Sequence, residues 1–251
     1  MIQTADRAFA VVEQVARAGR PCGLTDIASA SGLDKSTASR MLAFLDARGL
    51  LERDASSKRY TVGPALMSLA AVVIGGSGLP QVAQPHLDRL RDESGETVSL
   101  HLRSGYERVC VAGAASRAVL QRVLTIGEPV PLWSGPTSKM ILARLGPADR
   151  AEVLAVAEAA GVGVTSLARE LDRARRRGFI VAVGDRTPGV GAVSAPVRGP
   201  SGMVGALTAA GPAERWTKKR MGAFAPHLVA TATRLSAELG GPAGLMTPDV
   251  R

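Results

Sequence analysis

The fold is decided between residues 24 and 45, which read Leu-Thr-Asp-Ile-Ala-Ser-Ala-Ser-Gly-Leu-Asp-Lys-Ser-Thr-Ala-Ser-Arg-Met-Leu-Ala-Phe-Leu. In the first half, apolar residues recur at spacings of three and four through Leu24, Ile27 and Ala28, which predicts a short amphipathic helix. Thr25 is the expected N-cap, because a threonine hydroxyl can accept a backbone N–H bond. Gly32 is expected to end the helix, since glycine adopts the left-handed conformation without a Cβ clash.

A second helix is predicted directly afterwards, with Asp34 as its N-cap. Positions i, i+3, i+4 and i+7 predict its buried face: Ala38, Met41, Leu42 and Leu45. The opposite face combines hydroxyl groups with cations, at Lys35, Ser36, Thr37, Ser39 and Arg40. Such groups bond to phosphates and base edges, and arginine can read guanine with two hydrogen bonds. Taken alone, this face fits a solvated surface as well as a DNA contact.

A short hairpin follows the two helices. Leu50-Leu51-Glu52-Arg53 predicts one strand, residues 54–57 a polar turn, and Lys58-Arg59-Tyr60-Thr61-Val62 a basic return strand. Two helices, a tight turn and a basic hairpin in this order predict a winged helix-turn-helix, whose second helix enters the major groove of duplex DNA. The residues expected to contact DNA are Thr25, Lys35, Ser36, Thr37, Ser39, Arg40, Lys58 and Arg59.

Composition is typical of a globular protein in a reducing compartment. The 251 residues leave room for two domains, and a hydrophobic content of 46% suffices for packed cores although aromatic residues make up only 3%. No apolar run has the length of a membrane span, and the first residues lack the pattern of a signal peptide. Cys22 and Cys110 lie far apart, so we expect no disulfide and a cytoplasmic location.

The net charge of +9 is not concentrated on the predicted winged helix. Residues 1–62 contain nine Lys and Arg against seven Asp and Glu, a net of +2, so the rest of the chain carries +7. The total charge therefore indicates either general attraction to DNA or solubility. The DNA prediction depends instead on the placement of Lys35, Arg40, Lys58 and Arg59.

The pattern divides the chain into a winged helix-turn-helix domain over 1–62, a linker helix over 63–79 and a larger domain over 80–251. A helix is also expected over 4–18. In the larger domain the predicted helices are 80–94, 136–145, 148–160, 166–177 and 214–239. The predicted strands are 96–102, 108–111, 119–125, 179–183, 190–197 and 203–209. This mixture of helices and antiparallel hairpins predicts an α+β architecture over one curved sheet.

Motifs of catalysis, metal binding and phosphate binding are not recognisable in the sequence. His86, His101 and His227 lack the spacing of metal ligands, and there is no Gly-x-Ser-x-Gly elbow or Gly-Lys-Ser/Thr phosphate loop. Cys110 lies in an alternating strand, which favours a buried thiol over a nucleophile. The sequence thus predicts no catalytic residue, metal or cofactor.

In the order of these pieces the chain resembles the IclR family of bacterial transcriptional regulators over nearly its whole length. The matching segments are Leu24-Thr25-Asp26-Ile27-Ala28, Lys35-Ser36-Thr37 with Arg40, Gly49-Leu50-Leu51-Glu52-Arg53, Gly95-Glu96-Thr97-Val98, Gly127-Glu128-Pro129-Val130-Pro131-Leu132, Ser138-Lys139-Met140-Ile141-Leu142-Ala143, Gly189-Val190, Ala195-Pro196-Val197 and Gly211-Pro212. Each segment alone is a weak signal, whereas their order and spacing together are specific.

The resemblance implies a regulator, not an enzyme, with an N-terminal winged helix, a linker helix and a C-terminal effector-binding domain of GAF-like α/β fold. Family members bind small organic acids or aromatic metabolites there. They act as homodimers or dimers of dimers on palindromic double-stranded operator DNA, and we expect repression rather than activation. Leu66, Leu69 and Val73 either face a partner chain or pack on their own domain.

The resemblance also places an effector pocket. In the family, backbone amides of the loop before the Lys-x-x-Leu-Ala helix hold a ligand carboxylate, and that loop here is Trp133-Ser134-Gly135-Pro136-Thr137-Ser138. Pro136 departs from the pattern because proline has no N–H. The pocket residues carried over are Val119, Arg122, Val130, Thr137, Ser138, Asp185, Ala192, Thr208 and Ala210.

Four of these positions leave the character of the pocket open. Arg122 faces either inward, to an acidic ligand, or outward into solvent. Asp185 either contacts the ligand or caps a turn. Ala192 and Ala210 stand where some relatives have polar or thiol side chains, which predicts a roomier and more apolar cavity.

The sequence leaves two other functions open. An enzyme-like small-molecule domain tethered to a DNA-binding module would need a nucleophile and a base in the pocket. A DNA-binding protein whose second domain only oligomerises would show no change of thermal stability with any metabolite.

Overall fold

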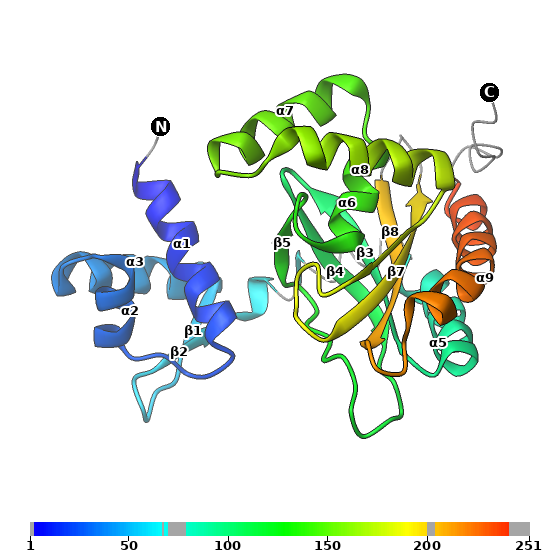
Figure 1. Cartoon of the computed structure of the whole chain (residues 1–251). Helices are drawn as coiled ribbons and strands as arrows, with labels where there is room; N and C mark the ends of the chain where they lie inside the picture. Colours follow the sequence, from blue (N-terminus) through cyan, green and yellow to red (C-terminus); the bar gives the residue numbers. More distant parts are fainter. Residues whose placement is uncertain (1–2, 67, 70–78, 200–203, 241–251) are drawn as a thin grey trace. The chain divides into compact units, whose positions relative to one another are not determined.

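The computed structural model describes residues 3–66, 68–69, 79–199 and 204–240. The chain divides into two compact units, Met1–Gly78 and Leu79–Arg251 (Figure 1). Within the described ranges, no helix combines the length and the apolar character needed to cross a membrane.

In its described residues, the N-terminal unit contains the helices α1, α2 and α3 and a small wing. Its elements are α1 (Gln3–Ala18), α2 (Leu24–Ser31), α3 (Lys35–Ala47), β1 (Leu51–Arg53) and β2 (Tyr60–Val62). The predicted inner face of α3 is buried, and its Met41, Leu42 and Leu45 share one apolar core with residues of α1 and α2. Residues 64–66 and 68–69 are helical, whereas Val73 of the predicted linker helix lies outside the described residues.

The turn between α2 and α3 has the predicted end signals. Gly32 ends α2 with a φ of +64°, and Asp34 Oδ1 accepts a 2.9 Å hydrogen bond from a backbone amide in the first turn of α3. The prediction that Thr25 caps α2 is wrong, because the helix begins one residue earlier. Its N-cap is Gly23, whose N–H donates to the Asp26 carboxylate at 3.3 Å.

The wing is a hairpin whose return strand begins later than predicted. Lys58 and Arg59 lie in the turn, and β2 begins only at Tyr60. The Asp54 carboxylate accepts hydrogen bonds from the amides and hydroxyls of the Ser56–Ser57 pair at distances up to 3.2 Å. These bonds fix a wide turn, and Lys58 has a φ of +57°, which belongs to turns and not to strands.

The C-terminal unit is built on one antiparallel sheet with the strand order β5-β4-β3-β8-β7-β6. Its strands are β3 (Thr97–Ser104), β4 (Glu107–Ala114), β5 (Pro129–Pro131), β6 (Ile180–Val183), β7 (Val190–Arg198) and β8 (Val204–Pro212). Its helices are α5 (Leu79–Ser94), α6 (Gly135–Arg144), α7 (Pro147–Ala159), α8 (Val164–Arg177) and α9 (Lys218–Glu238). Helix α9 begins later than predicted, because Thr217 is its N-cap and accepts a hydrogen bond from the Arg220 amide.

The sheet separates two apolar cores. Helices α5 and α9 pack on one face against alternate strand residues such as Val98, Leu100 and Val193, and helices α6, α7 and α8 lie on the other face (Figure 1). Because successive strand residues point to opposite faces, the intervening residues of β3 point toward α6. These residues are polar: Thr97, Ser99 and His101.

A β-bulge changes which residues of β4 point toward α6. The register of the β3–β4 pair shifts, so that Leu100 pairs with Ala112 while His101 pairs with Cys110. The residue between the two partners on β4 is left over, as in other bulges. Ala112 therefore joins the core under α5 and α9, whereas Cys110 and Arg108 face the same space as His101.

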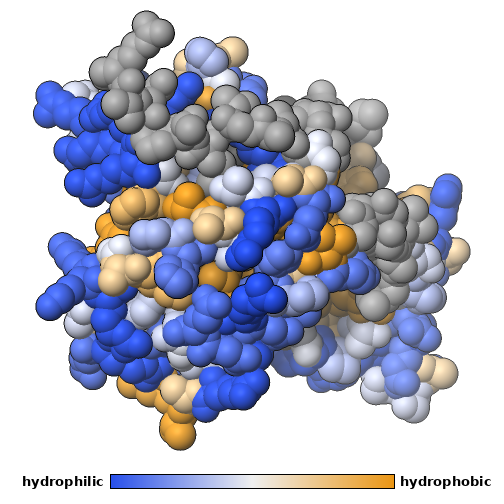
Figure 2. All heavy atoms as spheres, turned by 90° about the vertical axis from the view of Figure 1, so that its right-hand side faces the viewer, coloured by the Kyte–Doolittle hydropathy of each residue, from blue (hydrophilic) through white to orange (hydrophobic). Residues whose placement is uncertain are grey.

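The predicted strand over 119–125 is wrong, and these residues belong to a loop over 115–128 that joins β4 to β5. The edge strand beside β4 is β5, which is proline-rich and pairs with Glu107–Val109. Four large apolar side chains of this loop are exposed: Val119, Leu120, Val123 and Ile126. Figure 2 shows apolar surface at the bottom of the molecule, at the level of this loop in Figure 1.

Candidate functional site

The outer face of α3 is open to solvent. Lys35, Ser36, Ser39 and Arg40 are exposed, and Thr37 is half-buried. A groove of about 430 Å³ runs between α3 and the wing, and Ser39, Lys58 and Arg59 are among its lining residues. The fold thus brings the predicted reading face and the basic turn of the wing to one concave surface.

Several of the predicted DNA-contacting groups already have partners within the N-terminal unit. The Ser36 hydroxyl donates to Asp34 Oδ1 at 2.6 Å, and this bond is the largest cause that lowers the pKa of Asp34. Arg59 Nη1 donates to the Pro21 carbonyl at 3.1 Å. Arg40 and Lys58 have no hydrogen bond or ion pair from their side chains to any described residue, so both cations are available to an external anion.

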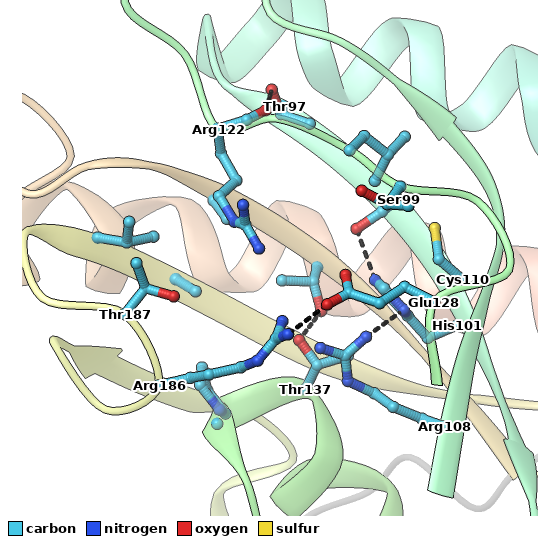
Figure 3. Close-up of a pocket in the computed structure, with 18 of the residues that line it drawn as sticks. Thr97, Ser99, His101, Arg108, Cys110, Arg122, Glu128, Thr137, Arg186 and Thr187 are labelled. Carbon is cyan, nitrogen blue, oxygen red and sulfur yellow. Dashed lines mark hydrogen bonds and ion pairs between the residues drawn. The ribbon is translucent and has the colours of Figure 1, made fainter. Parts of the chain in front are cut away.

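A second candidate site is a cavity of about 80 Å³ in the C-terminal unit (Figure 3). Its walls come from β3, β4, β7 and β8, from the loops 115–128 and 184–189, and from the first turn of α6. Three arginines line it, one from β4 and one from each loop: Arg108, Arg122 and Arg186.

Arg108 is a buried cation at the wall of this cavity, with 7% of its surface exposed. Its Nε donates to Ser138 Oγ at 2.9 Å and its Nη1 donates to His101 Nδ1. Burial lowers the pKa of Arg108 to about 10, and the neighbouring guanidinium of Arg186 lowers it as well, whereas Glu128 raises it. Among the described residues no carboxylate forms an ion pair with Arg108.

His101 is held as a neutral hydrogen-bond acceptor for Arg108. Because arginine only donates, the Nδ1 atom of His101 must be unprotonated, and Nε2 therefore donates to Ser99 Oγ at 2.8 Å. Burial lowers the pKa of His101 well below its usual value, and the charges of Arg108, Arg186 and Arg122 act in the same direction. The ring remains neutral at physiological pH.

Hydroxyl groups and the start of α6 form another part of the wall. Thr208 Oγ1 lies 2.9 Å from Thr137 Oγ1 and 2.8 Å from Ser194 Oγ. Gly135 begins α6 with a φ of +81°, and Pro136 follows in the first turn without an N–H group. The amides after Pro136 and the positive end of the helix dipole would stabilise a negative charge placed at this end of α6.

Six of the nine residues predicted for the effector pocket line the cavity: Arg122, Thr137, Asp185, Ala192, Thr208 and Ala210. Arg122 therefore faces inward. Asp185 neither stands free nor caps a turn, because its carboxylate accepts a 2.8 Å hydrogen bond from Lys139 Nζ. The cavity is smaller than expected, at about 80 Å³, and three arginines line it together with Ala192 and Ala210.

The other three predicted pocket residues do not line the cavity. Val119 is fully exposed on the loop that was predicted to be a strand. Val130 is buried in edge strand β5, where it pairs with Arg108. Ser138 is buried too, and its hydroxyl acts indirectly by accepting the hydrogen bond from Arg108.

Sequence reasoning missed Arg108, His101, Glu128 and Arg186. One signal was present, because Thr97, Ser99 and His101 alternate with apolar residues along one predicted strand, and this places three polar side chains on a single face. The bulge in β4 makes the Arg108 side chain face the cavity, and no sequence pattern predicted this bulge. Cys110 also lines the cavity, and burial raises the pKa of its thiol to about 11.

Metal binding has no structural support in the described parts of the chain, where no group of three or more His, Cys, Asp or Glu side chains could hold an ion. Cys22 and Cys110 are both free thiols. The guanidinium, amide and hydroxyl donors at the cavity can therefore bind an anion.

Comparison with known proteins finds two family models that match the chain. The IclR helix-turn-helix domain matches residues 4–55, and the bacterial transcriptional regulator IclR C-terminal domain matches residues 71–237. The chain is 32% identical over 249 residues to the glycerol operon regulatory protein of Streptomyces coelicolor, covering 95% of this chain and 97% of that protein. It is 25% identical over 248 residues to the transcriptional repressor AllR of Salmonella typhi, covering 95% and 90%.

A solved structure has the same fold along almost the whole chain. It is an IclR homologue from Microbacterium hydrocarbonoxydans in complex with 4-hydroxybenzoate, with a TM-score of 0.77 and 22% identity, covering 94% of this chain and 99% of that one. These comparisons confirm the predicted arrangement of an N-terminal winged helix-turn-helix and a C-terminal α/β effector domain.

We predict that the neutral state of His101 makes stability depend on pH. Because its pKa is lower in the folded protein than the usual 6.5, the unfolded chain takes up a proton first as pH falls below about 6.5. The free energy of unfolding should therefore decrease below that pH, by at most about 1.4 kcal/mol per pH unit from this group. Urea unfolding at several pH values measures the slope, and His101→Gln should flatten it. The same change at the exposed His227 is the control, and an equal effect of both variants would contradict the assignment.

Proposed function

We propose, from the premise that this chain belongs to the IclR family of bacterial transcriptional regulators, that a small organic anion in the C-terminal cavity sets its affinity for operator DNA. The family consists of DNA-binding regulators with an effector domain and not of enzymes. The proposed DNA-binding domain is 1–62, the linker 63–79 and the effector-binding domain 80–251.

The observation that carries the proposal is the excess of positive charge around the cavity. Arg108 and Arg122 line it without an ion pair to any described carboxylate, and Arg186 has a single one, with Glu128. A buried guanidinium is costly unless an anion or hydrogen-bond acceptors replace its hydration. A ligand carboxylate would supply that anion and could accept paired hydrogen bonds from a guanidinium.

The size of the cavity favours a short aliphatic acid. Its volume is about 80 Å³, whereas one water molecule in the liquid takes about 30 Å³ and drug-sized ligands need roughly 300 Å³ or more. An aromatic acid, such as the 4-hydroxybenzoate bound by the related structure, would require the loops around the cavity to open. The proposed ligand contacts are Arg108, Arg122, Arg186, Thr137 and Thr208.

For DNA, we propose that α3 lies in the major groove with Lys35, Ser36, Thr37, Ser39 and Arg40 toward the duplex, and that Thr25, Lys58 and Arg59 contact phosphates. The support is the exposure of this face beside the groove to the wing. Arg40 is the proposed base reader, since its guanidinium has no partner in the described chain. The name of the AllR relative makes repression the favoured mode.

We also propose that the N-terminal unit pairs with a second copy of the chain, as two half-sites require. An apolar groove of about 710 Å³ lies between α1, α3 and the residues Ala65, Ser68 and Leu69. Phe9, Phe44 and Leu69 at this groove are 68%, 53% and 59% exposed. Apolar surface of this kind is typical of a protein–protein contact, and a homodimer or a dimer of dimers would cover it.

The effector proposal predicts a thermal shift that depends on ligand size. Oxalate and malonate should raise the melting temperature of the full-length protein more than 4-hydroxybenzoate at equal concentration, because a ligand that binds only the folded form stabilises it. Differential scanning fluorimetry measures this ranking. A larger shift with the aromatic acid would contradict the size argument, and no shift with any acid would favour a domain that only oligomerises.

Arg40→Ala should weaken binding to the specific operator by about 1–3 kcal/mol if this side chain reads a base. Lys58→Ala should weaken binding evenly across DNA sequences and reduce the salt dependence by roughly one phosphate contact. Fluorescence anisotropy with operator and scrambled duplexes at several salt concentrations separates the two patterns. Operator affinity that is unchanged in Arg40→Ala would exclude the base contact.

Phe9→Glu should weaken self-association at least about tenfold, because it places a charge in the proposed contact between copies. Sedimentation velocity over a concentration series measures the change. Ala16→Glu adds the same charge at an exposed position of α1 outside the groove and should leave association intact. Equal behaviour of the two variants would place the contact elsewhere.

A further inference from the structure

Glu128 is one of two acidic residues at a cavity that three arginines line. It ends the loop 115–128 and directly precedes β5. Figure 3 shows its side chain among Arg108, Arg122 and Arg186, with a dashed line to Arg186. The Glu128 carboxylate accepts a hydrogen bond from Arg186 Nη2 and forms an ion pair with it.

The other carboxylate at the cavity, that of Asp185, is already paired with the ammonium group of Lys139. Asp185 accepts from Lys139 Nζ at 2.8 Å, and the same ammonium donates to Glu170 at 3.0 Å. Asp185 therefore cannot compensate the arginines without giving up this contact. In the part of the chain that the structure describes, Glu128 is the cavity carboxylate whose partner is itself a cavity arginine.

The influence of Glu128 extends beyond its ion pair with Arg186. Burial and the charge of Arg186 lower the pKa of Arg108, whereas Cys110 and Glu128 raise it. Such compensation at short range is strong where water is excluded. Glu128 thus compensates the positive charge of the arginines in the unliganded cavity, as a ligand carboxylate would in the occupied cavity.

We propose that Glu128 is a resident counter-anion, which occupies the anion position of the cavity and which a ligand carboxylate must displace from Arg186. The inference rests on the proposed effector function and adds to it a residue that sets affinity and selectivity. A ligand has to outcompete a tethered carboxylate, so weakly bound cellular anions are excluded.

Displacement would also change the contact between two loops. Glu128 belongs to the loop 115–128 and Arg186 to the loop 184–189, so their ion pair joins the loops across the cavity. The first loop has further attachments: Thr97 Oγ1 donates to the Arg122 carbonyl at 2.9 Å, and Arg215 Nη2 donates to the Leu120 carbonyl at 2.8 Å. Next to β5, the Gly127 amide donates to the Cys110 carbonyl at 2.8 Å. Ligand entry would thus break the contact between the two loops, while these backbone hydrogen bonds keep the first loop in place.

The test is replacement of the deleted carboxylate by free acetate in the full-length Glu128→Ala protein. The variant should melt at a lower temperature than the wild type without ligand, because the arginines lose their counter-anion. Acetate should restore the melting temperature of the variant. The acetate concentration that gives half of the maximal shift should be at least tenfold lower for the variant than for the wild type. Chloride at equal ionic strength should not restore the melting temperature. This comparison separates binding of acetate at a site from general screening of charge by salt.

Glu107→Ala is the matched control, since Glu107 is an exposed acid on β4 outside the cavity. It should respond to acetate like the wild type. Equal acetate affinity in Glu128→Ala and wild type, or equal recovery with acetate and chloride, would overturn the role of Glu128 alone. If no carboxylate binds to either protein, the proposed effector site fails as well.

A second variant covers the case in which Glu128→Ala does not fold. Glu128→Gln keeps the volume and an oxygen that can accept from Arg186, and removes only the charge. Oxalate should bind this variant at least threefold more tightly than the wild type by calorimetry. An affinity equal to or below that of the wild type would contradict the proposal.

Discussion

The buried guanidinium of Arg108 is the constraint that explains the polar side of the C-terminal unit. Removing a charge from water costs several kcal/mol unless other groups replace its hydration. Ser138 and neutral His101 accept its hydrogen bonds, and His101 can accept because burial, together with the surrounding cations, lowers its pKa and keeps its ring unprotonated. The bulge in β4 and the buried start of α6 are needed to bring these groups together. These groups are neutral, so the positive charge of Arg108 stays without a paired carboxylate, and this defines the chemistry of the cavity.

The two units use positive charge in different ways. On α3 and the wing the cations are exposed, so their attraction for a polyanion reaches several ångströms into solvent and weakens as salt increases. Around the cavity the cations are partly or wholly buried, so they act at short range and are screened little. An exposed surface suits a long polymer with repeated phosphates, whereas an enclosed one suits a single small anion. The different burial of Arg40 and Arg108 thus corresponds to different partners.

The N-terminal unit could be predicted closely from the sequence because its signals are local. The spacing of Ala38, Met41 and Leu42 fixes the inner face of α3, and Gly32 with Asp34 fixes the turn. The cavity could be predicted only in part, because it joins residues from β3, β4, α6 and two loops. The segment near Val119 carries apolar residues that suit a strand, yet it forms a loop, because strand pairing depends on contacts between distant segments. Only the fold shows that β5 pairs with Glu107–Val109 of β4, and only the bulge turns Arg108 toward His101.

The prolines of β5 have a consequence for how copies of the C-terminal unit can meet. Pro129 and Pro131 face Val109 and Glu107 across the ladder, at one border of the sheet. Neither has an N–H to offer, so that border is a poor template for intermolecular strand addition. The unit is thereby protected on this side from swapping and fibrillar aggregation while the chain is being synthesised and folded.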